Sequence, residues 1–243
     1  MFSQPAPVTG STSSSDLPVN SPLAAAAVTT TSTTTAPASP AAANQGQDAE
    51  GRQSAAAAPC SSELAGWKMK LKAALRHFPD FPIKGIDFVD IMPLFLDPAV
   101  HDILVSALDL QIKELYTENP PDVIVGLDAR GFLFGPGLAL RRAVSFAPVR
   151  KKGKLPGPCV TAEYRKEYGV DLFQMQKDAI KPGQKVLIVD DIIATGGSAK
   201  AAADLVKQLG GEIMGFLFIL EIPGLHGREK LEGIQTTILL EDA

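Results

Sequence analysis

The sequence predicts an α/β fold in which a mostly parallel central sheet is flanked by helices. Residues 123–127, 186–189 and 213–221 are short, continuous apolar runs, which is typical of strands buried on both faces of a sheet. Amphipathic stretches of helical length separate these runs, so strands and helices alternate along the chain. Ligands of such sheets bind at the carboxyl ends of the strands, where the informative polar motifs also lie.

The helices are predicted from the spacing of apolar residues and from residues that begin or end a helix. A first helix is expected to begin at Ser61 or Ser62 and to bury one apolar face, formed by Leu64, Trp67, Leu71 and Leu75. The prolines of residues 77–82 end it, because proline lacks an amide hydrogen and restricts the residue before it. Further helical stretches are expected over residues 98–116, up to about Arg142, and over 199–209 before Gly210 and Gly211.

The first quarter of the 243-residue chain has a different composition from the rest. Ser, Thr, Ala and Pro fill 39 of positions 1–59, and Phe2 is the only aromatic residue there. A segment with so little to bury cannot offset the entropy lost on ordering, so we expect a disordered extension over 1–59. It lacks the continuous apolar stretch of a secretory signal, and its first basic residue is Arg52, which disfavours a transit peptide. One ordinary domain is then expected over residues 60–243.

Composition excludes several classes of protein. The net charge is −4, from 23 basic and 27 acidic residues, so the basic excess of a nucleic-acid-binding protein is missing. No apolar run reaches the ~18–20 residues that a membrane helix needs. Two cysteines cannot form a disulfide framework or a metal cluster, and they fit a reducing compartment such as the cytoplasm.

The strongest functional signal is the thirteen-residue motif at positions 186–198, VLIVDDIIATGGS. Asp190 and Asp191 follow an apolar strand, and a run of small residues then opens a helix. The free amides of a helix start, together with the hydroxyls of Thr195 and Ser198, can bind an anion. Carboxylates accept hydrogen bonds from vicinal hydroxyls. No Lys follows the glycines, so this is not a Walker loop, and capping a helix would not require two adjacent acids. The motif predicts a site for a ligand with a phosphate and a ribose.

This motif resembles the phosphoribosyl-pyrophosphate (PRPP) signature of the type I phosphoribosyltransferases. The resemblance implies their fold, a central sheet with a small hood. It also implies that Asp190 and Asp191 bind the ribose 2′ and 3′ hydroxyls. The 5′-phosphate would be held by Ala194, Thr195, Gly196, Gly197 and Ser198.

A second motif, GLDARGFLFG at positions 126–135, follows another strand. Arg130 is a planar, permanently charged group suited to phosphate, although an Asp128–Arg130 structural pair would explain it equally well. The motif is similar to the pyrophosphate loop of adenine phosphoribosyltransferases. The resemblance implies a pyrophosphate contact from Arg130 and a cis peptide bond between Asp128 and Ala129.

Two polar segments follow. Residues 150–157 form a basic loop after an expected strand over 147–149; by itself this would be a solvated charge run, and the resemblance implies pyrophosphate contacts from Lys151 and Lys154. Residues 161–169 are expected to form a long polar loop that acts as a lid. Taken alone, Glu167 would be an exposed charge. The resemblance implies that Glu167 handles a proton of the purine and that Tyr168 contacts the nucleotide.

Residues 78–82 and 85–91 are expected to form the side of the hood that faces the base. Phe88 could stack on a purine or belong to the core, and the sequence leaves both open. The resemblance implies that Phe88 stacks on adenine, that the Asp87 carbonyl and Val89 amide read its edge, and that Ile192 contacts it. Several family members carry an apolar residue at the position of Asp87 and Arg at that of Val89, so side-chain contributions there differ.

The resemblance implies an enzyme of purine salvage that converts adenine and PRPP to AMP and pyrophosphate. Glu167, Arg130 and Lys151 would be catalytic, and Mg²⁺ would be held mainly through PRPP rather than by protein ligands. A homodimer is implied, with neither nucleic acid nor membrane as partner. Two alternatives stay open: transfer to another purine, for which no Lys is placed to bind a 6-oxo group, and a PRPP-sensing regulator without turnover.

Overall fold

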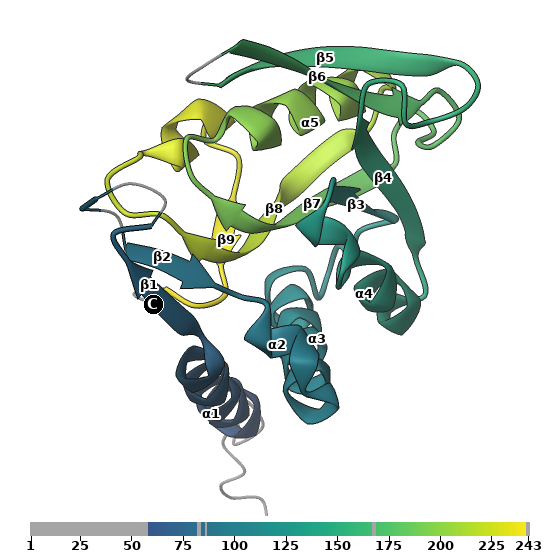
Figure 1. Ribbon diagram of the computed structural model, residues 1–243. Helices are drawn as coiled ribbons and strands as arrows, with labels where there is room; N and C mark the ends of the chain where they lie inside the picture. The colour runs from purple at the N-terminus through teal and green to yellow at the C-terminus, as the bar shows by residue number, and fades with distance from the viewer. Residues whose placement is uncertain (1–57, 82–83, 86, 167–168, 242–243) are drawn as a thin grey trace, which may run out of the picture. The chain divides into compact units, whose positions relative to one another are not determined.

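The computed structural model describes residues 58–81, 84–85, 87–166 and 169–241 (Figure 1). All but the last two residues of the expected N-terminal extension lie outside these ranges. Those two residues, Ala58 and Pro59, begin helix α1 (Ala58–Ala74). The predicted start at Ser61 or Ser62 is therefore wrong. Alanine is the strongest helix former, and proline is tolerated in the first turn of a helix, so both residues can extend it.

The predicted helices are confirmed with small shifts of their ends. α3 (Pro98–Leu115) is capped by the preceding residue, Asp97, whose Oδ1 accepts a hydrogen bond of 2.8 Å from the Ala99 amide. The remaining helices are α2 (Pro93–Leu96), α4 (Gly135–Arg142) and α5 (Gly197–Gln208), with 3₁₀ turns η1 (Arg130–Phe132) and η2 (Gly227–Leu231). No helix in the described part of the chain is long and apolar enough to cross a membrane.

The central sheet confirms the predicted fold class. Its seven strands lie in the order β5-β6-β4-β3-β7-β8-β9, and the five from β4 to β9 pair in parallel. β5 and β6 form an antiparallel hairpin at one edge. The strands are β3 (Val123–Leu127), β4 (Ser145–Lys151), β5 (Cys159–Lys166), β6 (Gly169–Gln176), β7 (Lys185–Ile193), β8 (Glu212–Glu221) and β9 (Thr236–Ile238).

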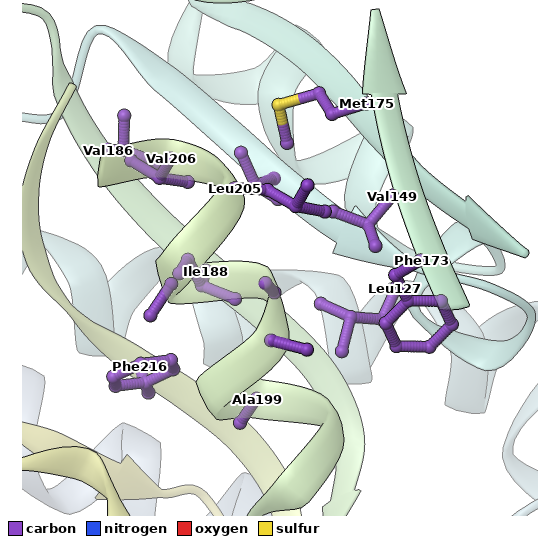
Figure 2. Close-up of a cluster of buried hydrophobic side chains, with 14 of the residues drawn as sticks. Leu127, Val149, Phe173, Met175, Val186, Ile188, Ala199, Leu205, Val206 and Phe216 are labelled. Carbon is purple, nitrogen blue, oxygen red and sulfur yellow. The ribbon is translucent and has the colours of Figure 1, made fainter. Parts of the chain in front are cut away.

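Alternate residues of the buried strands face two separate apolar clusters. In β7, Val186 and Ile188 contribute to the cluster that includes α5, whereas Leu187 and Val189 contribute to the cluster on α1 to α4. Figure 2 draws the first cluster, with Leu205 and Val206 of α5 among its members. Because both faces are covered, the strands read as continuous apolar runs in the sequence.

The expected loop conformation over residues 161–169 is wrong, because residues 161–166 belong to β5 and Gly169 begins β6, with which β5 pairs. Along β5, Ala162 and Tyr164 are buried while Thr161 and Glu163 are exposed, which is the alternation of a strand with one covered face. The polar outward residues concealed this period in the sequence. The expected basic loop also starts later than predicted, since Arg150 and Lys151 are the last residues of β4.

A second, two-stranded sheet is formed by β1 (Arg76–Pro79) and β2 (Asp87–Asp90). The strands are antiparallel, and Phe78 lies opposite Phe88. α1 ends at Ala74, ahead of the prolines that were expected to end it, and the chain continues as strand β1, which includes Pro79.

The packing of α5 on the sheet leads to a stability prediction. Leu205 is fully buried, so Leu205→Ala is expected to lower the free energy of unfolding by about 2–5 kcal/mol through lost apolar contact and the cavity left behind. Met69→Ala, at a position that is 73% exposed, is the control and should change it by less than about 0.5 kcal/mol. Urea denaturation measures both. Equal effects at the two positions would contradict the assignment of Leu205 to the core.

Candidate active site

The sequence suggested that the paired acids follow a strand. In the structure they lie inside strand β7. Asp190 is in register with Phe218 of β8, and pairing continues to Ile193. The strand is longer than its apolar run because β8 offers hydrogen-bonding partners beyond Val189. The acids nevertheless lie toward the carboxyl end of the strand, where the sequence predicts the site.

A cavity of about 230 Å³ opens at this end of the sheet. Two segments contribute most of its surface, the loop after β3 and the stretch that joins β7 to α5. The structure thereby brings together all the residues that the sequence proposes for ribose and 5′-phosphate, along with Arg130. The lining consists of Asp128, Ala129, Arg130, Asp190, Asp191, Ile192, Ile193, Ala194, Thr195, Gly196, Gly197, Ser198, Ala199 and Phe218.

The stretch from Ala194 to Ser198 forms the start of α5. Gly196 has φ +73°, a left-handed conformation that glycine adopts without strain, and the helix begins at Gly197. The first amides of a helix have no partner within the helix, and the helix dipole favours negative charge there. Lined by these amides and by the segment that carries Thr195 and Ser198, this end of the cavity is suited to a phosphate.

Arg130 forms an ion pair with Asp191, one of the two paired acids. Its Nε lies 2.7 Å from Asp191 Oδ2, and the Asp191 side chain is 4% exposed while that of Arg130 is 44% exposed. The structural alternative of an Asp128–Arg130 pair is therefore wrong; Asp128 lies instead 3.4 Å from Arg150 Nε. The Asp128–Ala129 peptide bond is cis, as the resemblance implied.

Burial shifts the pKa values of the acid pair upward. It raises the pKa of Asp190 well above its ordinary value, and the neighbouring charge of Asp191 adds to this increase. Burial also raises the pKa of Asp191, although the Arg130 guanidinium opposes that effect. Within the pair, the Asp191 amide donates a hydrogen bond of 3.0 Å to Asp190 Oδ1. The site thus holds two desolvated carboxyl groups with one cation beside them.

Sequence reasoning missed Gly131. A Cβ at this position would lie 2.9 Å from the Val189 carbonyl oxygen and 3.3 Å from Asp190 Oδ1. Only glycine lets the Arg130 loop approach β7 this closely, and that approach is what allows Arg130 to reach Asp191. The signal in the sequence was a glycine directly after an arginine that follows a strand, which indicates a close approach of the backbone. Phe218 was missed as well, because its place in the cavity depends on the pairing of β8 with β7.

Comparison with known proteins identifies the family. Residues 101–233, more than half of the chain, match the phosphoribosyl transferase domain family. The adenine phosphoribosyltransferase of Yarrowia lipolytica is 58% identical over 170 residues, which cover 70% of this chain and 93% of that protein. The Debaryomyces hansenii enzyme of the same name is 53% identical over 178 residues, covering 73% and 92%. The chain belongs to the adenine phosphoribosyltransferase family.

A solved structure of the family has the same fold. The Saccharomyces cerevisiae adenine phosphoribosyltransferase was crystallised with adenine and D-2,5-dideoxy-2,5-imino-altritol 1,6-bisphosphate. It is 50% identical in sequence, with a TM-score of 0.70 over 72% of this chain and 99% of that one. The predicted family, fold class and enzyme class are thereby confirmed.

Part of the site expected for an adenine phosphoribosyltransferase lies elsewhere. Lys151 ends β4 and Lys154 lies in the turn that follows; both are exposed and neither lines the cavity. The Lys154 carbonyl accepts a hydrogen bond of 3.2 Å from Arg150 Nη1. Glu167 and Tyr168 lie outside the described residues.

The residues expected to bind adenine are also divided. Ile192 lines the cavity, but Asp87, Phe88 and Val89 lie on β2 of the small sheet and do not. Phe88 is half-buried, with its ring 5.2 Å from that of Phe81 in an edge-to-face arrangement. Asp87 Oδ2 lies 2.9 Å from His77 Nδ1, across the two strands.

The raised pKa of Asp190 leads to a prediction about stability. A carboxyl group whose pKa rises on folding favours the folded state while it is protonated, and this contribution is lost as pH rises through the raised value. At pH 7 the carboxylate of the unfolded chain must either take up a proton or be buried with its charge on folding, so Asp190 opposes folding and Asp190→Asn is expected to raise Tm. The gain should shrink as pH falls toward and below 3.8, where the carboxyl is protonated in both states.

Thermal denaturation of wild type and variant between pH 3.5 and pH 8 measures this difference. Asp178→Asn, at an exposed position, is the control and should leave Tm nearly unchanged. A lower Tm for Asp190→Asn at pH 7 would mean that the ionised carboxylate stabilises the fold, contrary to the prediction.

Proposed function

We propose that the residues gathered at the end of β7 transfer the phosphoribosyl group of PRPP to N9 of adenine, giving AMP and pyrophosphate. The observation that carries this proposal is the cavity in which the acid pair, the start of α5 and Arg130 meet. A ribose 5-phosphate presents both groups that this cavity can bind, vicinal hydroxyls for the acid pair and a phosphate for the start of α5. Membership of the adenine phosphoribosyltransferase family supports the same reaction.

The ribose 5-phosphate half of PRPP is assigned to the cavity lining. Asp190 and Asp191 accept hydrogen bonds from the 2′ and 3′ hydroxyls. The backbone of Ala194, Gly196 and Gly197, with the hydroxyls of Thr195 and Ser198, holds the 5′-phosphate at the start of α5. Both assignments are supported by the common cavity and by the unpaired amides at the helix start.

The reaction exchanges one bond at the ribose C1′ for another. The C1′–O bond breaks and its electron pair leaves with pyrophosphate, while the lone pair of adenine N9 forms the new C–N bond. Positive charge develops on the ribose ring, close to the carboxylates of Asp190 and Asp191. Arg130 and Lys151 stabilise the departing pyrophosphate, with Lys154 and Tyr168 as further contacts. Glu167 accepts the proton that the imidazole ring of adenine loses as N9 forms its bond to C1′.

Mg²⁺ fits the donors of this cavity. Three aspartates line the cavity, Asp128, Asp190 and Asp191, but among the described residues no group of three or more His, Cys, Asp or Glu could hold a metal ion. Mg²⁺ in phosphate sites keeps several waters and binds largely through substrate phosphates, so here it would be held mainly through PRPP, while Asp190 and Asp191 stay with the ribose hydroxyls. When bound, it neutralises charge on the pyrophosphate.

Adenine recognition is assigned to β2 and to Ile192. The Asp87 carbonyl accepts from the 6-amino group, the Val89 amide donates to N1, and Phe88 stacks on the ring. The adenine complex of the Saccharomyces cerevisiae relative supports this choice of base.

We propose that the protein works as a homodimer in the cytoplasm. Exposed apolar side chains on α2, η1 and α4 and beside them support a second copy as partner, since such surface is usually covered. These side chains are Met92, Leu96, Leu133 and Leu140. The free thiol of Cys159 is compatible with a reducing compartment.

A base panel tests the proposed function. The purified full chain is incubated with PRPP, Mg²⁺ and adenine, guanine or hypoxanthine, and pyrophosphate release is followed. Release with adenine alone is expected. Release with guanine but not adenine would overturn the choice of base. No release with any purine, with PRPP binding retained, would favour a regulator that senses PRPP.

The acid pair supplies a second test. The double variant Asp190→Asn, Asp191→Asn is expected to lose at least about 10²-fold in kcat, because it removes the charge that stabilises the developing positive ribose. Its circular dichroism spectrum should match that of the wild type. Asp178→Asn is the control, and AMP formation at the wild-type rate in the double variant would refute the assignment of these residues.

A further inference from the structure

The segment from His226 to Glu232, which contains η2, lies directly against the loop proposed to hold the 5′-phosphate. We call it the backing segment. Its residue Gly227 is buried, and a Cβ added there would lie 2.3 Å from the Ala194 carbonyl oxygen and 3.0 Å from the Gly196 amide nitrogen. Gly227 is absent from the cavity lining, so it contacts the loop without facing the ligand.

The contact is made between the backbones of two glycines, Gly196 and Gly227, neither of which has a side chain. A Cβ added at Gly196 would lie 2.2 Å from the Gly227 carbonyl oxygen. Real Cβ atoms do not approach other atoms this closely, so neither glycine could gain a methyl group unless the loop or the backing segment moved. The path of the Gly196 backbone therefore depends on where Gly227 lies.

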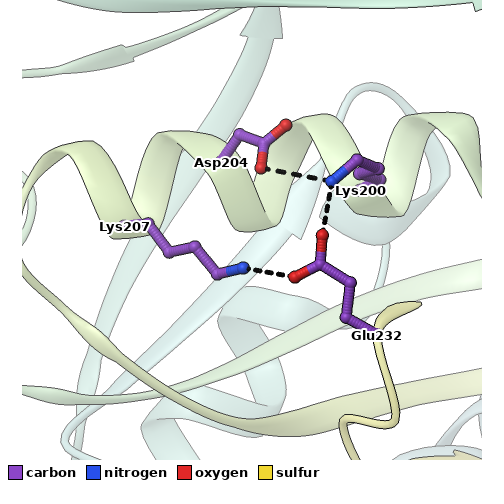
Figure 3. A network of polar contacts seen from close by, with 4 residues as sticks. All are labelled: Lys200, Asp204, Lys207 and Glu232. Atoms are coloured by element: carbon purple, nitrogen blue, oxygen red, sulfur yellow. Dashed lines mark hydrogen bonds and ion pairs between the residues drawn. The ribbon is translucent and has the colours of Figure 1, made fainter. Parts of the chain in front are cut away.

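Ion pairs hold the backing segment at both ends. Near its start, Arg228 Nε donates a hydrogen bond of 2.8 Å to Glu221 Oε2 at the end of β8. At its end, the Glu232 carboxylate lies 2.8 Å from both Lys200 and Lys207 of α5, as Figure 3 shows. These contacts tie the segment to α5, which follows the loop, and to β8, which pairs with the strand β7 that precedes it.

The Glu232 carboxylate, which pairs with Lys200 and Lys207, stays charged under ordinary assay conditions. Hydrogen bonds from Lys200 and then Lys207 lower the pKa of Glu232 to about 2. Lys200 also belongs to the helix start, since its amide donates a hydrogen bond of 2.9 Å to the Gly196 carbonyl. Gly196 is thus in contact with Gly227 and is hydrogen-bonded to Lys200, which in turn pairs with Glu232.

We propose that Gly227 is a positioning residue that sets the geometry of the 5′-phosphate loop, with Glu232 anchoring it to α5. The inference rests on the proposed function, because it assumes that the loop from Ala194 to Ser198 binds the phosphate. Displacing the loop misaligns the amides that bind PRPP and AMP, and it leaves the adenine contacts on β2 in place. A defect at Gly227 is therefore selective for ligands that carry the phosphate.

Gly227→Ala tests this inference in the full-length enzyme. We expect KM for PRPP to rise by about ten- to a hundred-fold, as misplacement by ~1 Å commonly causes, with KM for adenine nearly unchanged. Two controls separate contact from general damage. Gly137→Ala adds a methyl group in open space on α4, and Gly224→Ala adds one at a left-handed glycine (φ +79°) that has no neighbour within 4 Å. Both should keep the wild-type KM for PRPP, even where Tm falls.

Glu232→Gln tests the anchor with a variant that does not crowd the loop. It should raise KM for PRPP in the same direction and by a smaller factor than Gly227→Ala. Glu229→Gln makes the same change of charge at a carboxylate whose ion-pair partner, His226, belongs to the backing segment itself, and it should have no effect. If Gly227→Ala does not fold, these two glutamate variants still test whether the backing segment positions the phosphate loop.

Calorimetric binding of ribose 5-phosphate separates this inference from the proposed function. Weaker binding by Gly227→Ala, with adenine binding unchanged, supports the inference. An equal loss for ribose 5-phosphate and adenine, or a wild-type KM for PRPP in both Gly227→Ala and Glu232→Gln, overturns it. A wild-type enzyme that binds ribose 5-phosphate but forms no AMP would instead reject the proposed reaction.

Discussion

Two adjacent carboxyl groups buried at the end of β7 are the constraint around which the rest of the site is built. Removing a charged group from water is unfavourable, and burial raises the pKa of both Asp190 and Asp191. The compensating cation is Arg130, which comes from the loop after the neighbouring strand β3. It reaches Asp191 because Gly131 lets the backbone of its loop lie against Val189. A ligand that offers hydroxyl groups to the two acids would supply the hydrogen bonds that water no longer provides.

The elements proposed to bind the two substrates differ in how they are supported. Ribose and 5′-phosphate are assigned to a strand end and a helix start that are packed into the sheet and, through Gly227, against the backing segment. Pyrophosphate and adenine are assigned in part to Lys151, at the end of β4, and to the small sheet of β1 and β2. The two groups of proposed contacts therefore come from different elements of the fold, and only the first group lines the cavity.

Much of the fold could be predicted because its signals are local. The runs at 123–127, 186–189 and 213–221 are strands, and the amphipathic spacing over 98–116 is a helix. Predictions failed where a neighbour changed the outcome. β7 extends through Asp190 and Asp191 because β8 pairs with it, and residues 161–166 form a strand because β6 covers their backbone groups. β9 has only three residues, too few for a periodic pattern, and it depends on β8 for its hydrogen bonds.

The sequence by itself determined the fold class and the PRPP motif, because apolar period and a strand–acid–glycine–helix order are properties of consecutive residues. The tertiary structure decided which charges meet. Arg130 pairs with Asp191 instead of Asp128, and Arg150 takes Asp128, because β3, β4 and β7 are adjacent in the sheet. It also decided that Gly227 lies against Gly196, some thirty residues away in the chain. Contacts of this kind depend on how strands and helices pack, and no pattern within either segment encodes them.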